Sequence, residues 1–188
     1  NEYFLFDLLG DIYSLPISGG SAERITSGMA FDSQAVISPS GEKIAFISDR
    51  NGKNNLWIAD IDGSNPIQLS DETYTRMLSP AWTTDSNYVT VTERDKEIEL
   101  KQYHVDGGSG TTLSQADDDN SNPPGVGAAF SPDGNSVYFA EKLGSPDAPT
   151  EDFPVTQIVR LNLNDGSRLQ ITRGEGGAMR PKVSPDGK

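Results

Sequence analysis

A short turn motif recurs along this chain of 188 residues and constrains its fold more than any other feature. Each copy consists of an apolar stretch, a turn of the Ser-Pro-Asp-Gly type and a second apolar stretch. The turns lie at residues 38–41, 83–86, 131–134 and 184–187. Proline presets φ at the first corner, aspartate can hydrogen-bond back to the chain, and glycine supplies the positive φ that closes a hairpin. Each copy therefore predicts two antiparallel strands joined by a tight turn.

A second motif alternates with the first and sets the length of the repeat. It is an alternating strand, a glycine turn and a short strand that ends at Thr26, Ser70, Ser114 or Thr172, with spacings of 44, 44 and 58 residues. Periods in the forties match the roughly 40–45 residues of a four-stranded propeller blade. No stretch of useful length has helical spacing of its apolar residues. The sequence predicts an all-β fold: a β-propeller of four-stranded antiparallel blades, about four of them present.

The two motifs divide each blade into strands A to D and give the expected blade limits. These are a partial blade 1 (1–28), blade 2 (29–72), blade 3 (73–116), blade 4 (117–173) and the start of another blade (174–188). The apolar run 3–6, with Leu8 and Leu9, is interpreted as strand B of blade 1, buried between neighbouring blades. Residues 178–184 are interpreted as the strand A that follows blade 4.

The chain is thus expected to begin at a strand B and to end after a strand A. We expect a piece of a six- or seven-bladed ring. Self-association of two copies to complete a larger ring and a closed four-bladed ring remain as alternatives.

Composition narrows the classes of partner. The formal net charge is −13, so the surface repels phosphate backbones, and nucleic acid is not an expected partner. No apolar run approaches the roughly 20 residues that span a bilayer, so no membrane span is expected. The chain has no cysteine, which excludes disulfides, thiolate nucleophiles and cysteine-based zinc sites. Because it starts at Asn1 with no leader pattern, it is interpreted as a processed or trimmed piece.

The polar residues do not assemble a catalytic or metal motif in the sequence. His104 is the only histidine and is expected to be structural or at the surface. The acidic runs 117–120 and 151–152 lack the spacing of a calcium loop and are interpreted as solvated loops. Asp32, Asp49 and Arg50 are expected to tie loops to strands. The sequence therefore predicts no catalytic, cofactor-binding or metal residue, and no cofactor.

One segment is a candidate contact surface. Arg180 and Glu175, in and beside the glycine-rich stretch 174–177, lie where a strand D crosses to the next strand A. These glycines are not followed by the lysine and the serine or threonine that a phosphate-binding loop requires. We predict that Arg180 and Glu175 contact a ligand at the channel mouth or another domain.

The repeat resembles the TolB-type, WD-like propeller family. The resemblance is carried by the turns together with residues 44–52, 55–57 and 62–65, and it covers nearly the whole chain. It is specific for the fold, but such propellers serve periplasmic proteins, peptidases and hydrolases alike. Ser40 replaces aspartate in one turn and residues 83–86 replace a whole turn, changes expected to affect loops only.

A narrower resemblance concerns residues 6–13, 15–20, 26–34, 103–110 and 174–181, which look like the propeller of large secreted amidohydrolase-related proteins. In that family an N-terminal TolB-like propeller precedes a metal-dependent hydrolase domain. The His-X-His metal motif of that hydrolase is absent from this chain. The resemblance implies a non-catalytic propeller, periplasmic or secreted, that is accessory to a downstream hydrolase and binds a protein domain, peptide or substrate.

Two other functions remain open at this point. One is a stand-alone periplasmic protein-binding propeller of the TolB kind. The other is the propeller of a prolyl-oligopeptidase-type peptidase, which would require a Gly-X-Ser-X-Gly elbow that this chain does not contain.

Overall fold

The chain folds into β-sheets joined by turns. The computed structural model describes residues 3–71, 76–94, 98–115, 124–142, 156–174, 176–184 and 186–187. These residues form fifteen strands and no helix, so they contain no helix that could cross a membrane.

The strands assemble into four antiparallel sheets, one for each blade. Blade 1 has three strands, in the order β1(Tyr3–Leu8), β2(Asp11–Pro16), β3(Glu23–Arg24). Blade 2 has four, in the order β4(Asp32–Ile37), β5(Lys43–Ser48), β6(Asn55–Asp60), β7(Ile67–Gln68). Blade 3 contains β8(Arg76–Trp82), β9(Tyr88–Arg94), β10(Ile98–His104) and β11(Thr111–Gln115). Blade 4 contains β12(Pro124–Phe130), β13(Ser136–Lys142), β14(Thr156–Asn162) and β15(Arg168–Gln170).

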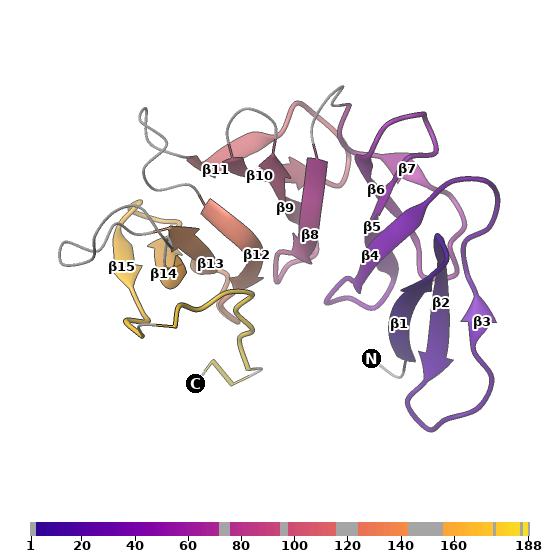
Figure 1. Cartoon of the computed structure of the whole chain (residues 1–188), viewed down its shortest axis with the longest axis horizontal. Helices are drawn as coiled ribbons and strands as arrows, with labels where there is room; N and C mark the ends of the chain where they lie inside the picture. Colours follow the sequence, from indigo (N-terminus) through magenta and orange to yellow (C-terminus); the bar gives the residue numbers. More distant parts are fainter. Residues whose placement is uncertain are drawn as a thin grey trace.

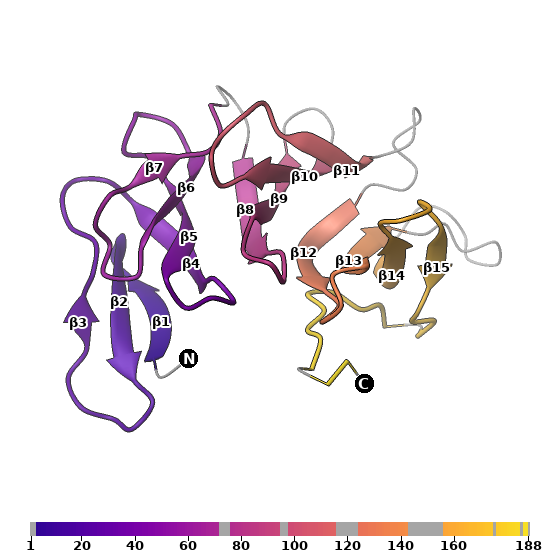
Figure 2. The ribbon, with the colours of Figure 1, turned by 180° about the vertical axis from the view of Figure 1, so that it is seen from behind.

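The four blades stand around an arc (Figures 1 and 2). Strands β4, β8 and β12 lie on its concave side, and β3, β7, β11 and β15 lie on the outside. The two ends of the chain both lie on the open side of the arc. This arrangement confirms the predicted propeller of antiparallel blades. We call β4, β8 and β12 the inner strands.

The turns between strands A and B have the chemistry expected from the sequence. In the turn of blade 4, Gly134 N–H donates to Ser131 O (2.9 Å) at a φ of 71°. The Ser131 hydroxyl also accepts from Ser136 N–H (2.9 Å). In blade 3 the divergent turn keeps the same geometry, because Ser86 adopts a φ of 62° in place of glycine and donates to Thr83 O (3.0 Å).

The core lies between blades rather than within one sheet. In the second strand of blades 2 and 3, nearly every side chain is buried, because a blade packs on each face. Three apolar clusters join blades 1 and 2, blades 2 and 3, and blades 3 and 4. Their buried members include Ile12, Ile44 and Phe46; Ile47, Met77 and Val89; and Leu100, Phe130 and Phe139, respectively.

The first strand differs from the prediction. We expected the apolar run of β1 to be buried, but Phe4 is 58%, Phe6 38% and Leu8 53% exposed. Only Leu5 of β1 joins the cluster shared with blade 2. The prediction was wrong because the β1 side chains on the other face have no sheet packed on them within the described residues.

The predicted strand A at 178–184 also differs. These residues are described, but they form no strand. A strand A pairs with its own strand B, and no described strand pairs with this segment. The segment instead passes from β14, where Ala178 N–H donates to Thr156 O (2.7 Å), to the inner strand β12, where Arg180 lies against Gly127.

Candidate functional site

The concave side of the arc carries two adjoining hollows. The first, which we call the inner-strand pocket, has a volume of about 300 Å³. Its lining comes from all three inner strands and the C-terminal segment: Gln34, Ala35, Val36, Ser79, Pro80, Gly127, Ala128, Arg180, Pro181 and Lys182. The second, the apolar hollow, has about 550 Å³, shares Lys182 with the pocket and is also lined by Phe4, Trp82 and Phe130. Both lie where a propeller has its central channel.

A backbone irregularity recurs at the pocket. The register of each inner strand shifts between Ser33 and Val36, Leu78 and Ala81, or Pro124 and Ala128. Within these shifts lie residues with left-handed backbone conformation, and Arg180 has one as well. Their φ values are 57° at Gln34, 54° at Ser79, 99° at Gly127 and 54° at Arg180. Such a conformation costs a residue other than glycine about 1–3 kcal/mol and is concentrated at functional sites.

Hydrogen bonds connect these irregularities between blades. Gln34 N–H donates to Asp7 Oδ1 of blade 1 (3.3 Å), and the Gln34 side-chain oxygen accepts from Ser79 N–H of blade 3 (2.8 Å). A Cβ added to Gly127 would lie 3.0 Å from the Arg180 Cα. The missing side chain of Gly127 therefore allows the C-terminal segment to approach blade 4 and positions Arg180 at the pocket.

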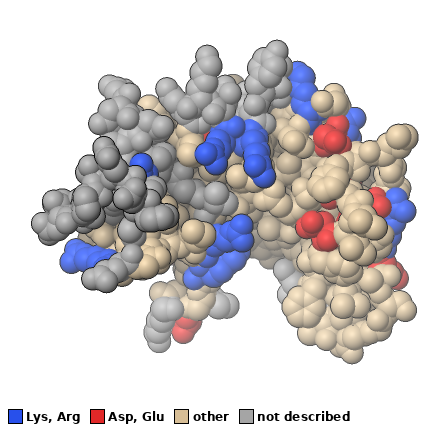
Figure 3. All heavy atoms as spheres, viewed as in Figure 1, with Lys and Arg blue, Asp and Glu red and all other residues tan. Residues whose placement is uncertain are grey.

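The charge of the pocket differs from that of the whole chain. Of the part of its lining that the structure describes, only Arg180 and Lys182 are ionisable, although the chain has 28 Asp and Glu against 15 Lys and Arg. Both side chains are exposed, and neither makes an ion pair with another described residue. Figure 3 shows basic side chains over the C-terminal segment in the middle of this face, and others over β8, outside the pocket. The pocket is thus a locally positive hollow.

The face of the molecule opposite the one drawn in Figure 3 carries the A–B and C–D turns and is rich in carboxylates. Hydrogen bonds from the Ser131 hydroxyl and from Asn135 lower the pKa of Asp133 to about 2. The pKa of Asp165 is lowered by hydrogen bonds from Ser167, and that of Asp60 by hydrogen bonds from Asn65 and Lys43. These turn carboxylates are ionised at neutral pH and serve to close the turns.

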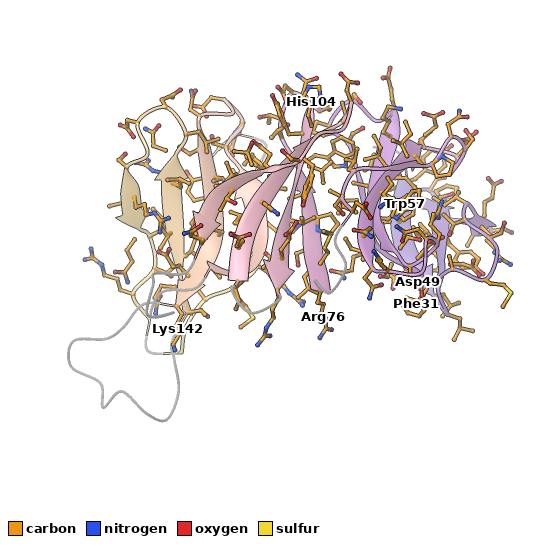
Figure 4. All side chains as sticks on the ribbon, turned by 90° about the horizontal axis from the view of Figure 1, so that it is seen from above. Phe31, Asp49, Trp57, Arg76, His104 and Lys142 are labelled. Atoms are coloured by element: carbon orange, nitrogen blue, oxygen red, sulfur yellow. The ribbon has the colours of Figure 1, made fainter. Side chains whose placement is uncertain are left out.

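His104 lies on this opposite face, as Figure 4 shows relative to Arg76. Its ring packs edge-on against Tyr88 with centroids 4.8 Å apart, and its Nδ1 accepts from Asp106 N–H (3.1 Å). Among the described residues, no group of three or more His, Cys, Asp or Glu side chains could hold a metal ion. The histidine is part of a turn.

Asp32, Asp49 and Arg50 connect neighbouring segments of blade 2. Arg50 Nη2 donates to both oxygens of the buried Asp32 carboxylate (3.0 and 2.9 Å), and its guanidinium lies 4.8 Å from the centre of the Phe46 ring. Asp49 Oδ1 accepts from Phe31 N–H (2.7 Å), on the same face as Arg76 in Figure 4. These contacts tie the link before β4 to the loop after β5.

Two buried carboxylates are also neutralised within the fold. Glu93 pairs with Lys101 (3.2 Å), and Glu141 pairs with Arg168 (2.5 Å). Arg168 also donates to Ser114 of blade 3 (3.0 Å), which links the last two blades. The two carboxylates are buried, whereas the Arg168 side chain is partly exposed, and neither pair is part of the inner-strand pocket.

Of the two residues singled out in the sequence, the structure places Arg180 at the pocket, whereas Glu175 lies outside the described residues. The acidic runs 117–120 and 151–152 also lie outside them. Sequence reasoning missed Gln34 and Ser79, although a signal exists. Like Gly127 and Arg180, they lie seven residues before the last residue of an A–B turn.

Comparison with known proteins agrees with this architecture. The family model of the TolB beta propeller domain matches residues 7–148. An uncharacterized protein of Agrobacterium fabrum is 29% identical over 115 residues, which are 57% of this chain and 39% of that protein. Tricorn protease homolog 1 of Streptomyces coelicolor is 26% identical over 116 residues, 60% of this chain and 11% of that protein.

A solved structure shows the same fold over nearly the whole chain. The putative TolB of Agrobacterium tumefaciens superposes with a TM-score of 0.79 at 24% identity, covering 99% of this chain and 63% of that one. The chain thus spans less than two thirds of these relatives. Four antiparallel blades, recurring turns and a family match over most of the sequence lead to one conclusion: the chain belongs to the TolB-like β-propeller family.

Proposed function

We propose that this chain is a non-catalytic binding propeller that holds a protein domain or peptide against its inner strands. The observation that carries the proposal is the pair of adjoining hollows of about 300 and 550 Å³ along those strands. Both have apolar residues in their lining, to which the first adds Gln34, Ser79 and two basic residues and the second adds Trp82 and Phe130. Concave surfaces that combine an apolar wall with a few polar groups are typical of binding sites. Three strained backbone positions at one of them support the same proposal.

The finer proposal is that the propeller is accessory to a downstream amidohydrolase-type metal hydrolase domain and that the protein is periplasmic or secreted. The sequence segments that resemble amidohydrolase-linked propellers support it. The sequence of the complete gene tests it. A His-X-His metal domain after Lys188 is expected, and a reading frame without such a domain would exclude the accessory role.

A peptidase propeller is the second candidate, supported by the match to tricorn protease homolog 1. A stand-alone binding protein of the TolB kind is the third. The same gene sequence separates them, because a serine hydrolase elbow indicates a peptidase and the lack of any catalytic domain indicates the stand-alone protein.

Hydrogen exchange tests the binding surface directly. Periplasmic extract would be passed over the immobilised chain, and a captured protein would then be added to the free chain. We expect slowed amide exchange in residues 34–37, 79–82 and 127–130. Protection confined to β7, β11 and β15, or to the A–B and C–D turns, would contradict binding at the inner strands.

A further inference from the structure

We propose that the inner-strand pocket binds a carboxylate group of a peptide, held by Arg180 and Lys182, with the neighbouring part of the peptide against the apolar hollow. This inference rests on the proposed binding function and names the ligand chemistry.

The charge distribution points to an anionic group. Among the described residues, the pocket is lined by two cations and no carboxylate, in a chain of net charge −13. Lys43 and Arg50, by contrast, pair with Asp60 and Asp32 within the fold. Clefts lined by one sign of charge concentrate ligands of the opposite sign. An acidic ligand therefore fits this hollow, whereas a cationic ligand does not.

The donors present suit a carboxylate. A guanidinium offers two parallel N–H groups to the two oxygens of a carboxylate, and a lysine adds a point charge. The Gln34 side-chain oxygen is occupied by Ser79 N–H, so its amide NH₂ is the end left to donate. Ser79, which carries a hydroxyl, lines the same wall. Charged and neutral donors from three segments thus converge on one hollow.

The backbone holds these donors in place. Arg180 adopts a φ of 54° directly before Pro181, and it packs on Gly127, where a Cβ would lie 3.0 Å from the Arg180 Cα. Gln34 and Ser79 occupy corresponding positions in their own blades, with φ values of 57° and 54°. Backbone strain of this kind clusters at functional sites and ligand clamps, and here it recurs at one surface.

The adjoining surface favours a peptide over an acidic sugar. Lys182 also lines the apolar hollow, which includes Phe4, Trp82 and Phe130. A ligand anchored by its carboxylate would therefore place its next groups against aromatic and aliphatic side chains. An acidic residue flanked by leucine or phenylalanine satisfies both surfaces, whereas a chain of sugar acids would leave hydroxyl groups against apolar side chains.

Fluorescence anisotropy with two peptides tests the proposal. The probes are fluorescein-labelled Gly-Gly-Leu-Glu-Leu-Gly-Gly and the same peptide with Gln in place of Glu, both amidated at the C-terminus. In 50 mM NaCl we expect the Glu peptide to bind about tenfold more tightly than the Gln peptide, as for a charge-assisted contact. The preference should shrink as salt is raised.

Two double variants identify the groups that bind. Arg180→Ala/Lys182→Ala should abolish the preference for Glu, while thermal unfolding stays unchanged because both side chains are exposed. Arg76→Ala/Arg94→Ala is the matched control, because it removes the same charge at a cross-strand pair outside the pocket. The control should retain the preference.

Several results would overturn the inference. These are equal affinities for the two peptides, an unchanged preference in Arg180→Ala/Lys182→Ala, and an equal loss in the control. Tighter binding of trigalacturonate than of the Glu peptide would replace the peptide with an acidic sugar.

If the Gln peptide protects the inner strands from exchange as well as the Glu peptide does, the binding function stands and the carboxylate site fails. If neither peptide nor any captured protein protects them, both fail.

Discussion

At the scale of single residues, the hydroxyl that follows strand D in blades 1, 2 and 4 makes the same hydrogen bond to strand C. The Ser70 hydroxyl accepts from Leu56 N–H (2.9 Å), and the Thr26 hydroxyl accepts from Ile12 N–H (2.9 Å). The Thr172 hydroxyl accepts from Ile158 N–H (2.8 Å) in the same way. Each one satisfies a backbone donor of strand C at the point where strand D stops pairing. Serine and threonine alternate freely here because only the oxygen is required.

Loss of one such hydroxyl should destabilise the fold. Ser70 is buried and also donates to Asn55 Oδ1 (2.8 Å), so Ser70→Ala leaves Leu56 N–H without its acceptor. We expect a loss of about 1–3 kcal/mol in the free energy of unfolding. Urea denaturation of Ser70→Ala, with exposed Ser18→Ala as control, measures it. Equal midpoints for the two variants would show that the hydroxyl is dispensable.

Asp133 should contribute to acid sensitivity. Its folded pKa of about 2 lies below its ordinary value of 3.8. Its contribution to the stability of the fold is therefore present above pH 3.8 and is lost as the pH falls toward 2. In Asp133→Asn we expect a slightly lower melting temperature at pH 7. We also expect the melting temperature of this variant to fall less steeply than that of the parent between pH 4 and pH 2. Melting temperatures from pH 2 to pH 7 test this. Parallel curves for the variant and the parent would contradict it.

At the scale of elements, corresponding strands of different blades meet different surroundings. Phe6 in β1 pairs with Tyr13, and Phe46 in β5 pairs with Trp57. Tyr13 and Trp57 each lie six residues before the glycine of a C–D turn, so the two phenylalanines occupy corresponding positions. Phe46 is fully buried against blade 1, whereas Phe6 is 38% exposed and stacks on Tyr13 (5.5 Å).

The two positions should therefore differ in stability. Phe46→Ala removes a buried ring between blades and should cost about 3–5 kcal/mol. Phe6→Ala removes a partly solvated ring and should cost about 1 kcal/mol or less. Chemical denaturation of both variants under identical conditions measures the difference. A cost for Phe6→Ala as large as for Phe46→Ala would mean that the outer face of blade 1 is covered in solution.

The elements also show how far sequence reasoning reaches. The spacing of the A–B turns predicted the hairpins β4–β5, β8–β9 and β12–β13, because turn chemistry is local. The nearly continuous apolar run made β1 look buried, since such a run shows what the faces of a strand can bury and not what covers them. Arg180 was singled out from its place between blades. Gln34 and Ser79 were not, because their left-handed backbone becomes apparent only when the inner strands are aligned on their turns.

At the scale of the whole molecule, the arc leaves an apolar sheet face open. Phe4, Phe6 and Leu8 are all exposed on the β1 face of blade 1. In blade 2 the corresponding face, with Ile44 and Phe46, packs on blade 1. The exposed face is therefore of the kind that this repeat uses to contact another blade.

This open face should drive self-association of the isolated chain. We expect sedimentation velocity to show species above the 20.2 kDa monomer as concentration rises. Phe4→Ser/Leu8→Ser should remain monomeric, whereas Ile17→Ser/Leu169→Ser, which removes exposed apolar groups elsewhere, should still associate. A parent chain that stays at the monomer mass at high concentration would exclude this contact.

The sequence by itself determined the blade: its four-strand order, its turns and the hydroxyls that close it. These depend on contacts within one repeat, where residue type and spacing fix the local geometry. The tertiary structure decided which faces are covered, which segments pair and which side chains meet at the concave side. Those outcomes depend on how successive blades pack, and the inner-strand pocket exists only because Gln34, Ser79, Gly127 and Arg180 come from four different segments.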